Sequence, residues 1–145
     1  MDQNVHFMTI ASHDLDATRQ FYETGAMWAS LLDVPGEIIF YQVAPGTVLS
    51  FFDADKFAQD AGLPAAPAVS GVTLAHNTSS RDDVKIIVSQ LEVAGGTVSK
   101  PAQDGAFGGV FHAHVTDPNG VIWEIAHNPF WDVADDGTVL LSEPS

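Results

Sequence analysis

The chain contains no cysteine among its 145 residues. Disulfide bonds, thiolate nucleophiles and zinc sites built on sulfur are therefore excluded, and any metal must be held by oxygen and imidazole ligands. No segment approaches the roughly 18 apolar residues of a membrane-spanning helix, and residues 1–4 lack the basic region of a signal peptide. We therefore expect a cytoplasmic protein that does not bind membranes.

Basic residues are also scarce, since 5 lysines and arginines face 19 acidic residues and give a net charge of −14. Such a chain repels phosphate backbones, so we expect no nucleic-acid partner. It also offers few cationic side chains for a polyanionic ligand such as a nucleotide. The acidic excess has two interpretations: a solvated surface that keeps the protein soluble, or a preference for a cationic ligand. The basic residues are Arg19, Lys56, Arg81, Lys85 and Lys100.

The first half of the chain predicts one helix among several strands. An apolar strand over 5–11 leads into a helix that begins near Asp14 and ends at Gly25, because apolar residues recur at helical spacing between them. Three extended segments follow, at 27–32, 37–43 and 47–52. Residues 60–70 are rich in alanine and proline, show no periodicity and are predicted to connect the two halves.

The second half repeats the pattern. A strand over 71–77 precedes Ser80 to Asp83, which have the spacing of a helix capping box. An apolar helical stripe then runs to Gly95, and strands are predicted at 97–99, 109–116 and 121–126. A duplicated βαβββ unit predicts a single α+β domain. Its parts are module one (about 5–60), the connector (about 60–70), module two (about 71–131) and an acidic tail (132–145).

The segment DPNGVIWEIAHNP, residues 117–129, places a carboxylate inside an otherwise apolar strand. Its DPNG start suits a type I turn closed by a glycine bulge. Counting outward from that turn pairs His114 with Glu124, with His112 further along the same face. The opposite face, with Val115 and Trp123, is apolar and is predicted to pack against helices.

These segments resemble the vicinal oxygen chelate superfamily, which includes glyoxalase I, bleomycin-resistance proteins, fosfomycin-resistance enzymes and extradiol dioxygenases. The resemblance extends from about Val5 to Trp131 and is closest to glyoxalase-like bacterial proteins that end in an EVAHNP-type strand. It rests on MTIASHDLDATRQFYE, VTLAHNTSSRDDV and FGGVFHAHVTDPNGVIWEIAHNP. It implies two βαβββ modules that form one open β-cup with helices on the outer face, a ligand pocket on the concave face, and a homodimer.

The resemblance places Glu124 at the position of the glutamate that coordinates metal in the catalytic members. The other ligand positions fall at Phe7, Ser50 and Thr73, which are neither histidine nor glutamate. We therefore expect no tightly bound cofactor. If a divalent metal binds, Glu124 and His114 are its predicted ligands, with His112 beside them.

Two other histidines lie at strand positions whose side chains should point away from this face. His6 precedes the expected ligand position by one residue, and His76 lies three residues beyond Thr73. Both side chains should point to the opposite face, where helices would cover them. We interpret both as core or edge histidines.

Without a metal, His114 and Glu124 can still act together. A carboxylate beside an imidazole favours the charged ring and orients its tautomer, which suits general acid or base catalysis. The alternative is a cross-strand pair that only satisfies two buried polar groups, and both interpretations stay open. The residues predicted to line the pocket around this pair are Phe7, Thr9, Ser50, Thr73, Asn77, Phe107 and His112.

Two functions follow from this site. The first is a glyoxalase-like lyase or isomerase that acts on a small neutral substrate through Glu124 and His114. The second is a non-enzymatic protein of the bleomycin-resistance type that sequesters a cationic or aromatic drug or metabolite. Orthodox glyoxalase I activity is not expected, because both the metal ligands and a basic clamp for glutathione are missing.

Overall fold

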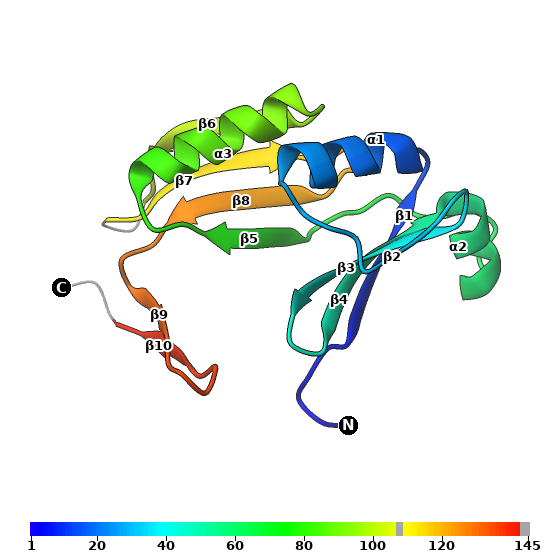
Figure 1. Cartoon of the computed structure of the whole chain (residues 1–145), viewed down its shortest axis with the longest axis horizontal. Coiled ribbons are helices and arrows are strands. Elements are labelled where there is room, and N and C mark those ends of the chain that lie inside the picture. The colour runs from blue at the N-terminus through cyan, green and yellow to red at the C-terminus, as the bar shows by residue number, and fades with distance from the viewer. Residues whose placement is uncertain (107–108, 143–145) are drawn as a thin grey trace.

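The computed structural model describes residues 1–106 and 109–142. Phe107, which was predicted to line the pocket, lies outside the described residues. Two four-stranded sheets and their helices form an α+β fold with two modules (Figure 1). The predicted duplication is thereby confirmed.

Module one pairs its strands in the order β1-β4-β3-β2. Its elements are β1 (Phe7–Ser12), α1 (Leu15–Arg19), the π-helix η1 (Gln20–Gly25), β2 (Leu32–Val34), β3 (Ile38–Ala44) and β4 (Thr47–Asp53). The carboxylate of Asp14 caps α1 by accepting a hydrogen bond from the Ala17 amide at 2.8 Å. The first and last strands run parallel, and the others pair antiparallel.

Module two repeats this order as β5-β8-β7-β6. Its elements are β5 (Thr73–Asn77), α3 (Arg81–Val93), β6 (Thr97–Asp104), β7 (Phe111–Thr116) and β8 (Ile122–His127). Ser80 caps α3, because its hydroxyl accepts a hydrogen bond from the Asp83 amide at 3.1 Å, while the Asp83 carboxylate accepts from that hydroxyl at 2.8 Å and not from the Ser80 amide as in a full capping box. The hairpin is confirmed as well: the Asp117 amide donates to the Val121 carbonyl at 2.8 Å, and His114 pairs with Glu124.

One local expectation is wrong, and two local elements were not predicted. The segment over 27–32 is extended only from Leu32, because Met27 adopts a left-handed φ of 61° and the Trp28 amide donates back to the Tyr22 carbonyl at 2.9 Å. The helix α2 (Ala54–Ala61), capped by Asp53, was not predicted; it ends where the predicted connector of about 60–70 begins. The acidic tail forms a hairpin of β9 (Trp131–Val133) and β10 (Val139–Leu141).

The modules contact each other where η1 packs on α3. A Cβ atom added to Gly25 of η1 would lie 2.6 Å from the Ala94 side chain at the end of α3, so only glycine permits this approach. The Tyr22 ring lies 4.7 Å from Phe51 of module one and 6.3 Å from Trp123 of module two, measured between ring centroids. One aromatic core therefore joins the two modules.

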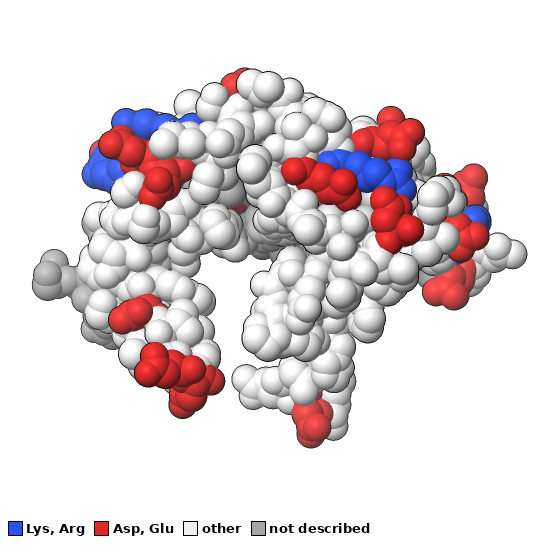
Figure 2. Space-filling view, in the orientation of Figure 1, with Lys and Arg blue, Asp and Glu red and all other residues white. Residues whose placement is uncertain are grey.

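The whole chain forms an open cup with an arched outline, and α1 and α3 lie along its outer side (Figure 1). Figure 2 shows a hollow between two limbs, one ending in the β9–β10 hairpin and the other in the β3–β4 hairpin and the N-terminal segment that extends beyond it. Acidic side chains lie near the ends of both limbs.

Candidate functional site

Strand alternation on β7 separates an apolar face from a polar one. Phe111, Ala113 and Val115 are buried and join the core that also contains α3, whereas His112 and His114 are only partly buried. Glu124 on the neighbouring strand β8 is likewise partly buried. The predicted apolar face therefore packs against α3, and both histidines and the glutamate lie on the opposite face of the sheet.

The carboxylate of Glu124 bonds to the diagonal histidine instead of the one directly opposite. His114 is its backbone partner across the ladder, but the hydrogen bond joins Glu124 Oε1 to His112 Nδ1 at 2.6 Å. A diagonal neighbour on an antiparallel sheet lies within reach of long side chains. His112, predicted as a ligand-binding residue, is thus the direct partner of Glu124.

A lysine completes this cluster. Lys100 Nζ lies 3.1 Å from His112 Nε2. Because a lysine ammonium can only donate, His112 Nε2 must accept, and the ring proton must reside on Nδ1, from which it is donated to Glu124. Lys100, His112 and Glu124 therefore form a hydrogen-bonded chain with a defined tautomer.

The sequence analysis did not identify Lys100, because a β-bulge decides where its side chain points. Val98 packs on the core and pairs with Val115 of the neighbouring strand. Lys100 pairs with His114, the residue next to Val115, so Ser99 is an extra residue in β6 that has no partner in β7. One inserted residue reverses the face that the following side chains occupy. Without it, Lys100 would share the core-facing side with Val98.

His114 is the imidazole of the cluster that makes no hydrogen bond among the described residues. Its ring centroid lies 5.3 Å from that of His112. Burial lowers the pKa of His114, the charge of Glu124 opposes this effect, and nearby His112 and Lys100 lower the pKa further. His114 is consequently neutral near pH 7 and is available to accept a proton.

His112, His114 and Glu124 also form a set of three donors whose ligand atoms lie within 4.8 Å of one another. Two imidazoles and a carboxylate suit zinc or a similar divalent ion. However, both ring nitrogens of His112 are already engaged, one by Glu124 and the other by the ammonium of Lys100. The residues present therefore do not fit a divalent metal while Lys100 remains in place.

Module one holds three of the residues predicted to line the pocket. The Thr9 and Ser50 hydroxyls lie 2.8 Å apart on paired strands. Phe7, which is 55% exposed, packs edge-on against Phe40 with centroids 5.6 Å apart. Among the described residues, no side-chain hydrogen bond connects this group with the cluster on module two.

Thr73 and Asn77 lie on β5, the edge strand beside β8, and both are exposed. His76 of the same strand is also exposed, as is His6 immediately before β1. The expectation that helices cover both histidines is therefore wrong, because each lies at an uncovered margin of its sheet. The prediction of an edge histidine holds for His76.

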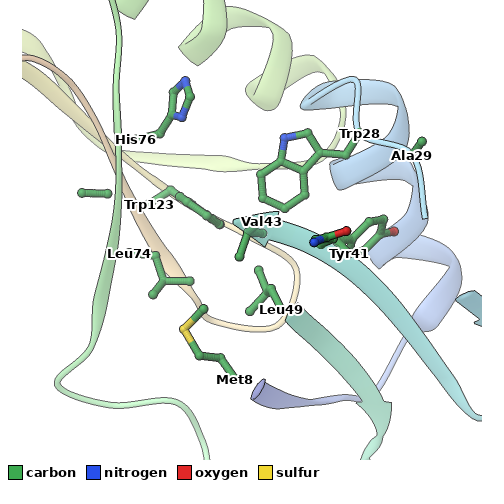
Figure 3. A pocket seen from close by; sticks show the side chains of 11 residues that line it. Met8, Trp28, Ala29, Tyr41, Val43, Leu49, Leu74, His76 and Trp123 are labelled. Atoms are coloured by element: carbon green, nitrogen blue, oxygen red, sulfur yellow. The ribbon is translucent and has the colours of Figure 1, made fainter. Parts of the chain in front are cut away.

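A cavity between the modules is separate from the cluster. It has a volume of about 480 Å³ and lies between the modules, where Trp28, Tyr41 and Trp123 border it (Figure 3). His112, His114 and Glu124 do not line it, nor do the other described residues predicted for the pocket. Local sequence patterns did not indicate this cavity, because aromatic side chains such as Trp28 and Trp123 are typical of protein cores.

Comparison with known proteins identifies the family. The chain matches the model of the glyoxalase/bleomycin resistance protein/dioxygenase superfamily over residues 4–125, and it belongs to that superfamily. A glyoxalase-related enzyme from Fulvimarina pelagi is similar to it, with 36% sequence identity, a TM-score of 0.87, and coverage of 97% of this chain and 99% of that chain. The comparison with curated proteins gives no match.

More distant solved structures share the fold. The lactoylglutathione lyase of Agrobacterium tumefaciens has 18% identity and a TM-score of 0.65, with 88% of this chain and 95% of that chain covered. The fosfomycin resistance protein FosX of Listeria monocytogenes, solved with Mn(II) and a dihydroxypropylphosphonic acid, has 13% identity and a TM-score of 0.62, with coverage of 86% and 90%. Among the described residues of this chain, no helix is long and apolar enough to cross a membrane.

Proposed function

We propose that this chain is a glyoxalase-like lyase or isomerase that transfers protons on a small neutral substrate without an orthodox glyoxalase I site. The observation that supports this proposal is a neutral His114 beside an ordered chain of Glu124, His112 and Lys100. A general base that works near pH 7 must be unprotonated there, and the lowered pKa of His114 meets this requirement.

The proposed reaction begins with removal of a proton next to a carbonyl group. His114 accepts the proton from carbon, and the electron pair of the broken C–H bond moves to the carbonyl oxygen, which gives an enolate. The negative charge of Glu124, which raises the pKa of His114, stabilises the imidazolium formed. In an α-hydroxy carbonyl substrate, the hydroxyl proton passes to the enolate oxygen and the former carbonyl carbon takes the proton back from His114, which completes an isomerisation. In a substrate with a leaving group on the β-carbon, the enolate re-forms the carbonyl, the electron pair forms a double bond between the α- and β-carbons, and the leaving group departs with its bonding electrons, which completes a lyase reaction.

Deuterium exchange tests this function without knowledge of the natural substrate. Hydroxyacetone and dihydroxyacetone are incubated with the protein in D₂O, and loss of the signal of the exchangeable C–H is followed by NMR. We expect exchange with the wild type and a rate reduced about 100-fold or more in His114→Ala, within the usual range for loss of a general base. His13→Ala removes an exposed histidine of module one and should retain the wild-type rate. Equal rates in wild type and His114→Ala would refute the assignment of the base.

The cavity between the modules favours a second function, the sequestration of an aromatic compound. Trp28 meets Trp123 edge to face with ring centroids 5.7 Å apart, and Tyr41 lies 5.7 Å from Trp28. Such walls suit an aromatic ligand, and the net charge of −14 favours a cationic one. Calorimetric titration with bleomycin tests this function: Trp28→Ala should weaken binding, while Trp131→Ala, outside the cavity lining, should not. No binding by the wild type would eliminate bleomycin as a ligand.

We further propose that the protein is a homodimer. Edge strand β2 contains only three residues, and its first residue Leu32 and the preceding Leu31 are exposed. An uncovered strand edge with apolar side chains is suited to pairing with a second copy. The cytoplasmic location expected from the sequence remains a prediction.

A further inference from the structure

We propose that Lys100 is a built-in cation that takes the place of a divalent metal at the cluster, so that its removal converts His112, His114 and Glu124 into a metal site. The inference concerns the same residues as the proposed function, but its test requires no turnover. Three observations carry it: the contacts of Lys100, the strand distortion that delivers it, and the charge balance of the cluster.

The contacts of Lys100 show that its ammonium group already uses the nitrogen lone pair of His112 that a metal ion would need. His112 Nε2 would be the free nitrogen of the ring, since Nδ1 is bonded to Glu124. Lys100 Nζ lies 3.1 Å from that nitrogen, and an accepting lone pair cannot also be given to a metal. A divalent ion at this position would, in addition, stand beside a positive charge at a separation of a few ångströms.

The position of Lys100 is built into the sheet. A bulge at Ser99 turns Lys100 toward the histidines, and a second register shift between Lys100 and Gln103 returns Ala102 toward the core. Bulges redirect side chains at specific places in a sheet. Lys100 is partly buried, which limits the freedom of its long side chain, so the ammonium is held at the cluster.

The charges are also complementary. The ammonium of Lys100 and the carboxylate of Glu124 carry opposite charges, and the His112 ring lies between them and contacts both. In the superfamily site that the sequence resembles, a metal bound to the glutamate at this position would supply the positive charge. Here that charge is fixed to the chain, and the ammonium protons not used by His112 remain able to donate to an oxygen atom of a ligand.

Zinc titration of the full chain tests the proposal. Isothermal calorimetry with ZnCl₂ at pH 7.5 compares the wild type, Lys100→Met and Lys56→Met, all without an affinity tag. Lys56 carries the same charge, but its side chain is exposed on α2 and is paired with Glu37 at 2.9 Å. We expect Lys100→Met to bind one zinc ion at least 10-fold more tightly than the wild type and Lys56→Met, and this gain should disappear in Lys100→Met/Glu124→Gln.

Equal zinc affinity in all three proteins, with Lys100→Met folded by circular dichroism, would overturn the proposal. If Lys100→Met does not fold, the wild type itself provides the test through the ¹⁵N spectrum of its histidines at pH 7. His112 must then carry its proton on Nδ1 and accept at Nε2, whereas a proton on Nε2 refutes the contact with Lys100. Failure of the deuterium exchange assay would leave both results unaffected, so the two proposals can fail separately.

Discussion

The Tyr22 hydroxyl donates a hydrogen bond to the Asp117 carboxylate at 2.7 Å and accepts one from the Trp123 indole at 3.0 Å. All three residues are buried. Tyr22 belongs to η1 of module one, whereas Asp117 and Trp123 belong to the β7–β8 hairpin of module two. Burial raises the pKa of Asp117, and its hydrogen bonds from Tyr22, Val121 and Asn119 oppose this effect. This polar contact therefore joins the two modules inside an apolar core.

Replacement of Tyr22 by phenylalanine should destabilise the fold by about 1–3 kcal/mol, because it leaves a buried carboxylate and a buried indole N–H each without one partner. Urea unfolding followed by circular dichroism measures the loss. Tyr41→Phe is the control, since the Tyr41 hydroxyl makes only a 3.3 Å bond to Glu23 and its loss should cost less. An equal cost in both variants would contradict the role given to the Asp117 contact.

His114 should titrate below its usual pKa of about 6.5, because burial lowers the pKa. As the pH falls through the window between the usual and the lowered value, the unfolded chain takes up the proton first, so His114 reduces stability on acidification. An NMR titration of the ring proton measures the pKa. Lys100→Met should raise it by removing a positive neighbour, and Glu124→Gln should lower it. A wild-type value above 6.5 would contradict the geometry of the cluster.

Changing His114 or Glu124 to alanine should affect ligand binding or turnover more than folding. The Glu124 side chain is 30% exposed, so water can replace the lost contacts and the loss of stability should be about 1 kcal/mol. If the cluster is instead a buried structural network, removing one partner leaves the other buried and unpaired, and the free energy of unfolding should fall by roughly 3 kcal/mol or more. Thermal melts beside binding titrations distinguish the two, and a large loss of stability with unchanged binding would remove both residues from the site.

The purified protein should retain less than one divalent ion per chain after dialysis. Phe7, Ser50 and Thr73 stand at the other ligand positions implied by the family resemblance, and Lys100 already bonds to His112. Elemental analysis after mild purification checks this expectation. Stoichiometric nickel, zinc, iron or manganese would show that the ligand assignment is wrong.

Light scattering should give the mass of a dimer across a wide range of protein concentration. The short edge strand β2 is the predicted contact, so Leu32→Lys should place a charge at that edge and shift the protein toward the monomer. Val93→Lys alters an exposed apolar residue at the end of α3 and should leave the dimer intact. A wild type that remains monomeric throughout would refute the dimer proposal.

The sequence by itself determined the duplicated module, the DPNG hairpin and the pairing of His114 with Glu124. These features depend on short-range rules: strand alternation, helical spacing and turn chemistry act over a few residues. For the same reason, the sequence placed the apolar face of the hairpin against helices correctly.

Only the tertiary structure decided the partner of Glu124, the position of Lys100 and the separation of the cavity from the cluster. The hydrogen bond from Glu124 to its diagonal neighbour His112 depends on how far each side chain reaches. Strand alternation alone would place Lys100 on the core-facing side of the sheet, but the bulge at Ser99 places it on the opposite side. The cavity depends on how η1 packs on α3, which brings Trp28 and Trp123 together from different modules. Contacts between residues distant in the chain follow from such packing, and local patterns do not encode them.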